Sequence, residues 1–189
     1  MSDGQSQEIE KIEAAAAGDM QAFAELVDEH RPRVLRTAYG IVGSIEEAED
    51  IAQEVFVKAW KSLPSYNRVG AFSSWLYRIT VNAAIDRFRR RRNETPLDDL
   101  PGQGATYVAT EHPEEDVIRQ ETRRALAAAI QALPPGARSA LVLREYEQLA
   151  YSEIADILQI PIGTVMSRLN YARKLLRKEL QEDVQSGAL

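Results

Sequence analysis

Apolar residues recur at every third or fourth position along most of this chain, and no segment shows the period-two alternation of a β-strand. Residues 44–63 show the pattern most clearly, because their apolar side chains follow the spacing i, i+3, i+4 and i+7 of one helix face. Ser44 is a suitable N-cap at the start of this segment, and Pro64 ends it. The periodicity therefore predicts an all-α fold.

A segment of different composition interrupts the helical pattern at residues 93–118. It holds seven acidic residues, three prolines, two glycines and no Lys or Arg, which is typical of a flexible linker. We therefore expect two small helical domains, over residues 1–92 and 119–189, joined by this acidic linker. The helices are predicted at residues 19–42 (one helix, or two broken at Pro32), 44–63, 71–92, 121–133, 136–149, 151–158 and 163–178.

The composition excludes several classes of protein. The chain has 23 Lys and Arg against 29 Asp and Glu, so any contact with nucleic acid must come from a local basic patch. It has no cysteine, its N-terminus is polar and acidic rather than a signal peptide, and no apolar run reaches the roughly 20 residues that span a membrane. We expect a cytoplasmic protein without membrane insertion, cofactor or metal site.

One basic helix contrasts with this acidic background. Residues 163–178 hold five basic residues and no acidic one, so they carry +5 and the rest of the chain carries −11. With the short helix at 151–158 they predict a helix-turn-helix whose second helix enters the major groove of DNA. A solvated basic face is the alternative interpretation. The predicted core is Ile154, Leu158, Ile160, Val165 and Leu169, and the side chains expected to reach DNA are Thr164, Ser167, Arg168, Tyr171, Arg173 and Lys174.

The helix at residues 71–92 interleaves aromatic and basic side chains and ends in four consecutive arginines. Aromatic rings stack on unpaired bases, arginines follow a phosphate backbone, and the amide of Asn82 can pair with a base edge. The alternative places Trp75 and Phe88 in the core and Asn82 in a local hydrogen bond. The pattern predicts a second contact with nucleic acid, made by Trp75, Arg78, Asn82, Arg87, Arg89, Arg90 and Arg91.

The helix at residues 44–63 is acidic on the side opposite its apolar stripe. Val57 and Trp60 lie beside Gln53 on that side, and large apolar groups bordered by acids favour a protein partner over a purely solvated surface.

Four segments, in this order and divided by the linker, carry a family resemblance: AEDIAQEVFVKAW, FSSWLYRITVNAAIDRFRRRR, LPPGARSALVLREYEQLAYSEIADIL and IPIGTVMSRLNYARKLLR. They resemble the extracytoplasmic-function (ECF) sigma factors, sigma-E-like members of the sigma-70 family and the smallest sigma subunits of bacterial RNA polymerase. The resemblance implies a helical region 2 domain, a helix-turn-helix region 4 domain and no enzymatic activity of the chain itself. Met166 departs from the family pattern, because many members have Arg or Lys there.

The resemblance also implies a role for each surface, and partners for the chain. Core RNA polymerase would be bound at the clamp helices of β′ and at the β flap, and the helix that ends in arginines would recognise and melt the −10 promoter element. The helix from Gly163 to Lys174 would read the −35 element, the linker would thread toward the polymerase active-site channel, and an anti-sigma factor is a further expected partner. The residues placed on the clamp helices are Asp50, Gln53, Glu54 and Phe56, with their neighbours Val57 and Trp60.

Two other functions fit parts of the chain. A stand-alone helix-turn-helix repressor or activator fits the C-terminal half, but it leaves the acidic helix and the aromatic-basic helix unexplained, and it would bind its operator without polymerase. A DNA recombinase has little support, because His30 and His112 are far apart and no Gly-rich phosphate loop or Ser nucleophile elbow is present.

Overall fold

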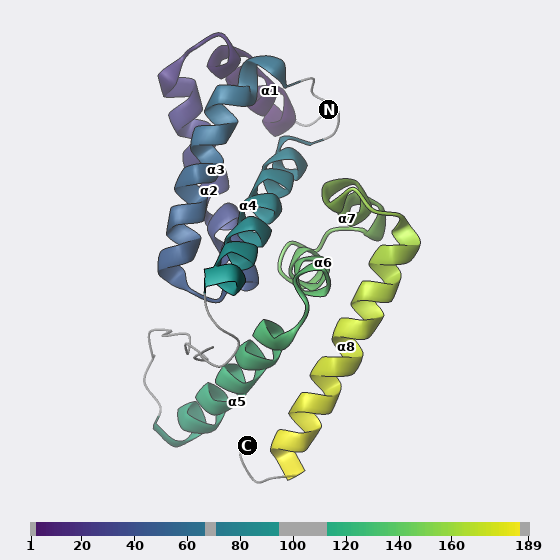
Figure 1. Cartoon of the computed structure of the whole chain (residues 1–189). Coiled ribbons are helices and arrows are strands. Elements are labelled where there is room, and N and C mark those ends of the chain that lie inside the picture. The colour runs from purple at the N-terminus through teal and green to yellow at the C-terminus, as the bar shows by residue number, and fades with distance from the viewer. Residues whose placement is uncertain (1–2, 67–70, 95–112, 186–189) are drawn as a thin grey trace.

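The computed structural model describes residues 3–66, 71–94 and 113–185, and every regular element in those ranges is a helix. The all-α prediction is therefore confirmed. Figure 1 shows α1 to α4 in one bundle, with α6 to α8 beside it, and α5 below the bundle leading up to α6. In chain order the elements are α1 (Asp3–Ala16), α2 (Met20–Val42), α3 (Ile45–Ser62), the 3₁₀ turn η1 (Leu63–Ser65), α4 (Phe72–Glu94), α5 (Pro113–Ala132), α6 (Pro135–Glu145), α7 (Tyr151–Leu158) and α8 (Ile162–Gln185).

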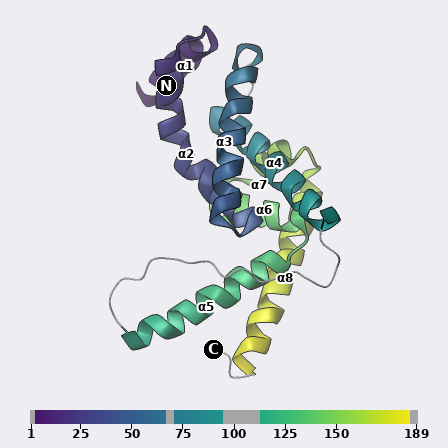
Figure 2. The ribbon, with the colours of Figure 1, turned by 60° about the vertical axis from the view of Figure 1, so that its left-hand side comes forward.

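The N-terminal bundle buries the apolar stripe that the sequence predicts for α3. Ile51 and Val55 of this helix are almost fully buried against α2 and α4. Ser44 is its N-cap, as predicted, since its hydroxyl oxygen accepts a hydrogen bond from the backbone N–H of Glu47 at 3.4 Å. Helix α2 is continuous and contains Pro32. Figure 2 shows α1 at the end of this bundle away from α5, and shows α5 and α8 extending below it.

Two helices begin where the sequence pattern did not predict them. Helix α1 was not predicted, although Ile12 and Ala15 bury its inner side against the rest of the bundle. Helix α5 begins at Pro113 rather than at residue 121, which fits a proline at the first helical position followed by acidic residues in the first turn. The middle of the predicted linker, residues 95–112, lies outside the described residues.

Helix α6 is shorter than predicted, because it ends at Glu145 rather than at Leu149. Gln148 has a left-handed backbone with φ of 57°, which α-helical geometry excludes. The guanidinium of Arg144 donates to the carbonyl of Leu149 at 2.8 Å and fixes the turn that follows. This turn, residues 146–150, holds Glu147 away from the helix axis.

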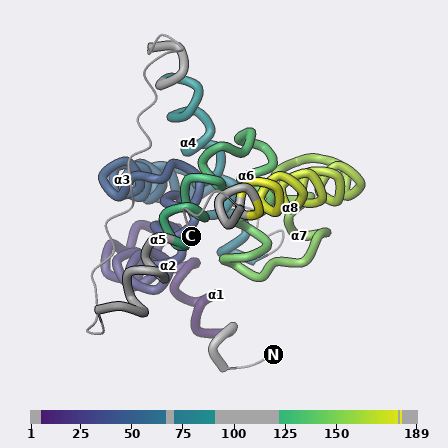
Figure 3. Tube along the Cα trace, turned by 90° about the horizontal axis from the view of Figure 1, so that it is seen from below, coloured from purple at the N-terminus to yellow at the C-terminus, as the bar shows by residue number. Residues whose placement is uncertain are grey.

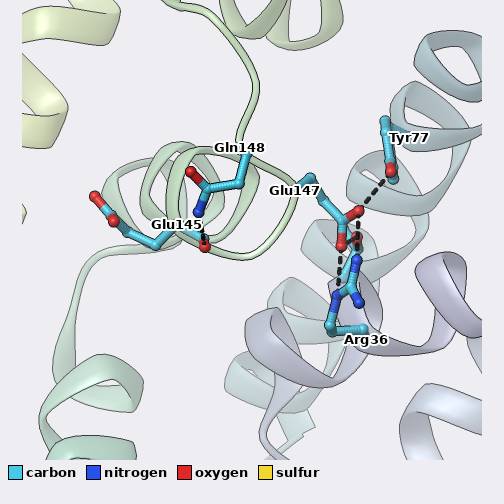
Figure 4. A network of polar contacts seen from close by, with 6 residues as sticks. Arg36, Tyr77, Glu145, Glu147 and Gln148 are labelled. Atoms are coloured by element: carbon cyan, nitrogen blue, oxygen red, sulfur yellow. Dashed lines mark hydrogen bonds and ion pairs between the residues drawn. The ribbon is translucent and has the colours of Figure 1, made fainter.

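The two halves of the chain pack together along the C-terminal part of α2. A Cβ atom on Gly40 would lie 2.8 Å from Cε2 of Tyr146 and 2.9 Å from Cγ2 of Val142, so only glycine lets α6 approach this closely. Figure 3, viewed from below, shows α6 between the N-terminal bundle and α8, as Figure 1 does from the side.

A buried arginine of α6 joins the ends of two other helices. Arg138 is 1% exposed, and its guanidinium donates to the carbonyls of Ile41 at 2.6 Å and of Leu133 at 2.9 Å. It also donates to the backbone carbonyl and the side-chain oxygen of Gln131, and it lies over the ring of Phe88 at 5.1 Å. These carbonyl groups, at the C-terminal ends of α2 and α5, help to compensate the buried charge of Arg138.

Candidate nucleic-acid interface

Helices α7 and α8 form the predicted helix-turn-helix. The carboxylate of Glu153 accepts from the backbone N–H of Ala150 at 2.7 Å and fixes the start of α7, and Gln159, with φ of 53°, ends it. Three of the predicted core residues are almost fully buried, and Leu158 and Ile160 are partly so. This small core packs α7 against α8, and the opposite side of α8 faces solvent. The fully buried members are Ile154, Val165 and Leu169.

The outward side of α8 contains most of the side chains predicted to reach DNA. Ser167, Tyr171 and Lys174 are exposed, and Thr164 is half-buried at the start of the helix. Ser167 donates its hydroxyl to the carbonyl of Thr164 at 3.0 Å, so both side chains belong to the first turns, where a recognition helix meets base edges. Met166 is 54% exposed among them.

The two remaining arginines of the predicted α8 surface have partners within the C-terminal half. Arg168 is half-buried over the start of α6, where a Cβ atom on Gly136 would lie 2.9 Å from its Cζ. Arg173 donates to Tyr151 Oη at 3.4 Å and to Glu145 at 3.1 Å, and these hydrogen bonds raise the pKa of its guanidinium. Both arginines are positioned by tertiary contacts, which spacing along α8 does not reveal.

On α4, four of the predicted residues share one face through their spacing. Trp75, Arg78, Asn82 and Arg89 follow intervals of three, four and seven, and the last three are exposed. Trp75 is half-buried in an aromatic cluster, with its ring 4.8 Å from that of Tyr66. The ring of Trp75 is therefore partly packed, as the core interpretation predicts, and its contact with DNA stays a prediction.

The arginines at the end of α4 differ in their exposure and in their partners. Arg89 and Arg90 are exposed, and Arg89 lies 3.7 Å from the carboxylate of Asp86. Arg87 is half-buried and pairs with Asp50 of α3 at 2.6 Å. The side chain of Arg91 lies outside the described ones.

The outward face of α3 carries an apolar patch within its acidic surface. Val57 is 53% exposed beside the exposed Gln53, and the ring of Trp60 packs on Phe23 with centroids 4.9 Å apart. Phe56 is half-buried against the core.

The two acids predicted on this face are paired. Asp50 holds Arg87 of α4, and Glu54 holds Lys58 one turn along α3 at 2.6 Å. The pair of Asp50 and Arg87 ties α3 to α4, so the predicted protein-binding face and the predicted α4 DNA-binding face adjoin each other.

Other kinds of site are not apparent in the part of the chain that the structure describes. No three His, Cys, Asp or Glu side chains gather there as metal ligands would. The helices in the described ranges are also too short or too polar to cross a bilayer.

Comparison with known proteins identifies both halves. Residues 26–94 match the family described as sigma-70 region 2, and residues 123–176 match sigma-70 region 4. The chain is similar to the RNA polymerase sigma-H factor of Pseudomonas aeruginosa, with 36% identity over 94% of this chain and 95% of that one. It is also 36% identical to the ECF RNA polymerase sigma factor SigW of Bacillus subtilis, over 91% of this chain and 96% of the relative.

A solved structure supports the same fold. The sigma factor RpoE of Bartonella quintana, in a co-crystal with the anti-sigma factor NepR, superposes with a TM-score of 0.67 at 22% identity, over 87% of this chain and 99% of that one. These relatives are sigma factors, which are a class of protein without enzymatic activity of their own. The two regional matches and the near full-length relatives together show that the chain belongs to the ECF sigma factors of the sigma-70 family, which direct RNA polymerase to promoters.

Proposed function

We propose that each of the three exposed faces binds a different partner during promoter-directed initiation. The α3 face around Gln53 and Val57 binds core polymerase at the clamp helices of β′, and the α4 face around Asn82 recognises and opens the −10 element. The outward side of α8 reads the −35 element, and its domain rests on the β flap. The observation that best supports this division is that each face lies inside the matching regional family, at residues 26–94 or 123–176, and presents exposed groups of suitable chemistry.

The chemistry of each face fits its proposed partner. Exposed amide and arginine groups on α4 suit base edges and phosphates, whereas an exposed valine and a half-buried tryptophan amid acids on α3 suit a protein surface. The net charge of −6 disfavours binding of DNA by the isolated chain, so polymerase must supply affinity. We place the chain in the cytoplasm with polymerase, and we propose an anti-sigma factor as its regulator, as the Bartonella quintana RpoE complex has.

Replacing Lys174 with Ala tests the assignment of α8. Lys174 is exposed on the outward side, so we expect it to contact a phosphate rather than a base. Its loss should weaken holoenzyme binding to all promoters alike, and the slope of log affinity against log salt should become shallower by about one unit. Fluorescence anisotropy of a labelled promoter with holoenzyme at several salt concentrations measures both quantities.

The matched control is Arg31→Ala, which removes an exposed cation of α2 outside the three proposed faces and should leave the slope unchanged. An unchanged slope for Lys174→Ala, or an equal change for both variants, would remove Lys174 from the DNA surface.

A further inference from the structure

Met166 and Asn170 lie about one turn apart on the exposed part of α8. The buried side of this helix is formed by Val165, Leu169 and Ala172. At about 100° of rotation per residue, Asn170 lies about 130° and Met166 about 90° from the middle of that buried side. Met166 is 54% exposed, and Asn170 is exposed as well. Both side chains are therefore accessible on the surface that we assign to the −35 element.

The two residues belong to the part of α8 that a helix-turn-helix places in the major groove. Helix α8 begins at Ile162, so Met166 is in its second turn and Asn170 is in its third. A rise of about 1.5 Å per residue separates them by about 6 Å along the helix axis, which is less than the roughly 12 Å width of the groove. Both side chains can therefore reach base edges at the same time.

The other polar groups near these two residues are engaged within the protein or discriminate poorly. Arg173 donates to Glu145 at 3.1 Å, and Arg168 is half-buried over the start of α6. Ser167 donates its hydroxyl within α8, and a hydroxyl can pair with several kinds of base edge. By contrast, no residue that the structure describes forms a hydrogen bond with the side-chain amide of Asn170. The amide and its apolar neighbour are therefore the groups best suited to distinguish one base pair from another.

The amide of Asn170 matches one base in the major groove. Adenine presents N7 as an acceptor and its N6 amino group as a donor, which a side-chain amide can bind together. Nδ2 of the asparagine donates to N7 in such a pair, and Oδ1 accepts from N6. Guanine presents two acceptors, O6 and N7, so Oδ1 would face another acceptor there. The amide therefore favours adenine over guanine.

The side chain of Met166 matches a different group. It has no hydrogen-bond donor and only a weak acceptor, so it cannot replace the water that it displaces from a polar base edge. The C5-methyl group of thymine is the apolar group that unmodified base pairs display in the major groove. Ile162, one turn earlier, is 50% exposed, so apolar surface continues toward the start of α8. Contact with a methyl group removes this apolar surface from water, which favours thymine.

We propose that Asn170 and Met166 determine the sequence preference of α8 by selecting A·T base pairs in the −35 element. Asn170 pairs with N6 and N7 of an adenine, and Met166 packs on the methyl group of a thymine within the same element. This proposal rests on the assignment of the outward side of α8 to the −35 element.

Selection from promoters with a randomised −35 region, bound by holoenzyme, measures the base preference at each position. Asn170→Ala should reduce the preference for one adenine roughly tenfold, and Met166→Ala should reduce the preference for one thymine about fourfold. Alanine is a good helix former, and both positions are exposed, so the fold should be retained. Each variant should keep the preferences at the remaining positions, which also reports that its helix-turn-helix is folded.

Base analogues test each contact at the level of single groups. 7-Deazaadenine lacks the N7 acceptor, so at the selected adenine it should weaken binding of the unchanged holoenzyme about fivefold. Uracil lacks the methyl group of thymine, so at the selected thymine it should weaken binding about fourfold. The first effect should vanish in Asn170→Ala and the second in Met166→Ala, because each variant has already lost the contact. Fluorescence anisotropy of labelled promoters measures these affinities.

Two further variants serve as controls. Met20→Ala removes a methionine of α2 that is 69% exposed and lies outside the proposed DNA surfaces, so it should change no base preference. Lys174→Ala should lower binding to all selected sequences alike and leave their ranking unchanged, because a phosphate contact does not depend on sequence.

The possible results separate this proposal from the function on which it rests. Unaltered base preference in either variant, or a change confined to G·C pairs, would overturn the proposal and leave the −35 assignment of α8 in place. Weaker binding of Met166→Ala to polymerase without a change in base preference would also overturn it, and would assign the apolar surface to a protein contact. If the unchanged holoenzyme selected no sequence in the randomised region, the −35 role of α8 would fail together with the proposal.

Discussion

Val57→Glu should lower the affinity of the chain for core polymerase roughly a hundredfold, or about 2–3 kcal/mol. Val57 is 53% exposed on α3, at the centre of the patch formed with Gln53 and Trp60. A carboxylate placed in the dehydrated centre of a contact loses its hydration without gaining a partner. Because the side chain makes no contribution to the core, the fold should be retained. Titration of labelled chain with core polymerase measures the Kd.

Ile45→Glu is a closely matched control for this change. Ile45 is an apolar residue of the same helix and is 57% exposed, but it lies in the first turn, outside the proposed docking residues. A new acid there also suits the N-terminal end of the helix dipole. Equal losses in both variants would indicate that any added charge on α3 is harmful, and unchanged binding of Val57→Glu would remove this face as the docking surface.

Asn82→Ala should reduce the number of open promoter complexes about tenfold, because one good base contact contributes roughly 1–3 kcal/mol. Asn82 is exposed on α4 on the same face as Trp75 and Arg78. If its amide recognises an unpaired base, the loss appears only after the strands separate, so binding in the closed complex should change little. Permanganate reactivity of promoter thymines reports opening, and electrophoretic mobility at low temperature reports closed-complex binding.

Asp86→Ala, one turn further along α4, removes an exposed acid and should not reduce opening. Equal losses in closed and open complexes for Asn82→Ala would assign it to duplex binding instead. No loss in either would place the side chain outside the DNA contact.

The sequence was a reliable guide where local patterns determine the structure. The period of α3, its Ser44 cap and the bounds of α7 are properties of neighbouring residues, and each was predicted correctly. Helix α1 escaped prediction because its segment is mainly polar and rich in small residues, with a buried side that depends on contact with other helices. Helix α6 ends early because Gln148 adopts a left-handed conformation, although apolar residues continue on both sides of it.

The exposed side chains of the candidate surfaces could be predicted from helical spacing, but their tertiary partners could not. Spacing places Ser167, Tyr171 and Lys174 outward, and the structure exposes them. Spacing along one helix gives no sign that Arg173 pairs with Glu145 of α6, or that Arg87 pairs with Asp50 of α3. The pairing of Glu147 with Arg36 could not be predicted from local sequence either, because 111 positions separate the two residues in the chain.

Transcription in vitro from a genomic promoter library, with core polymerase and with or without this chain, tests the central claim most directly. The account predicts new start sites that appear only when the chain is present and that share one pair of −35 and −10 sequences. If no new start appeared while the chain alone bound specific duplex DNA, the chain would act as a stand-alone DNA-binding regulator, and the proposed roles of α3 and α4 would be wrong.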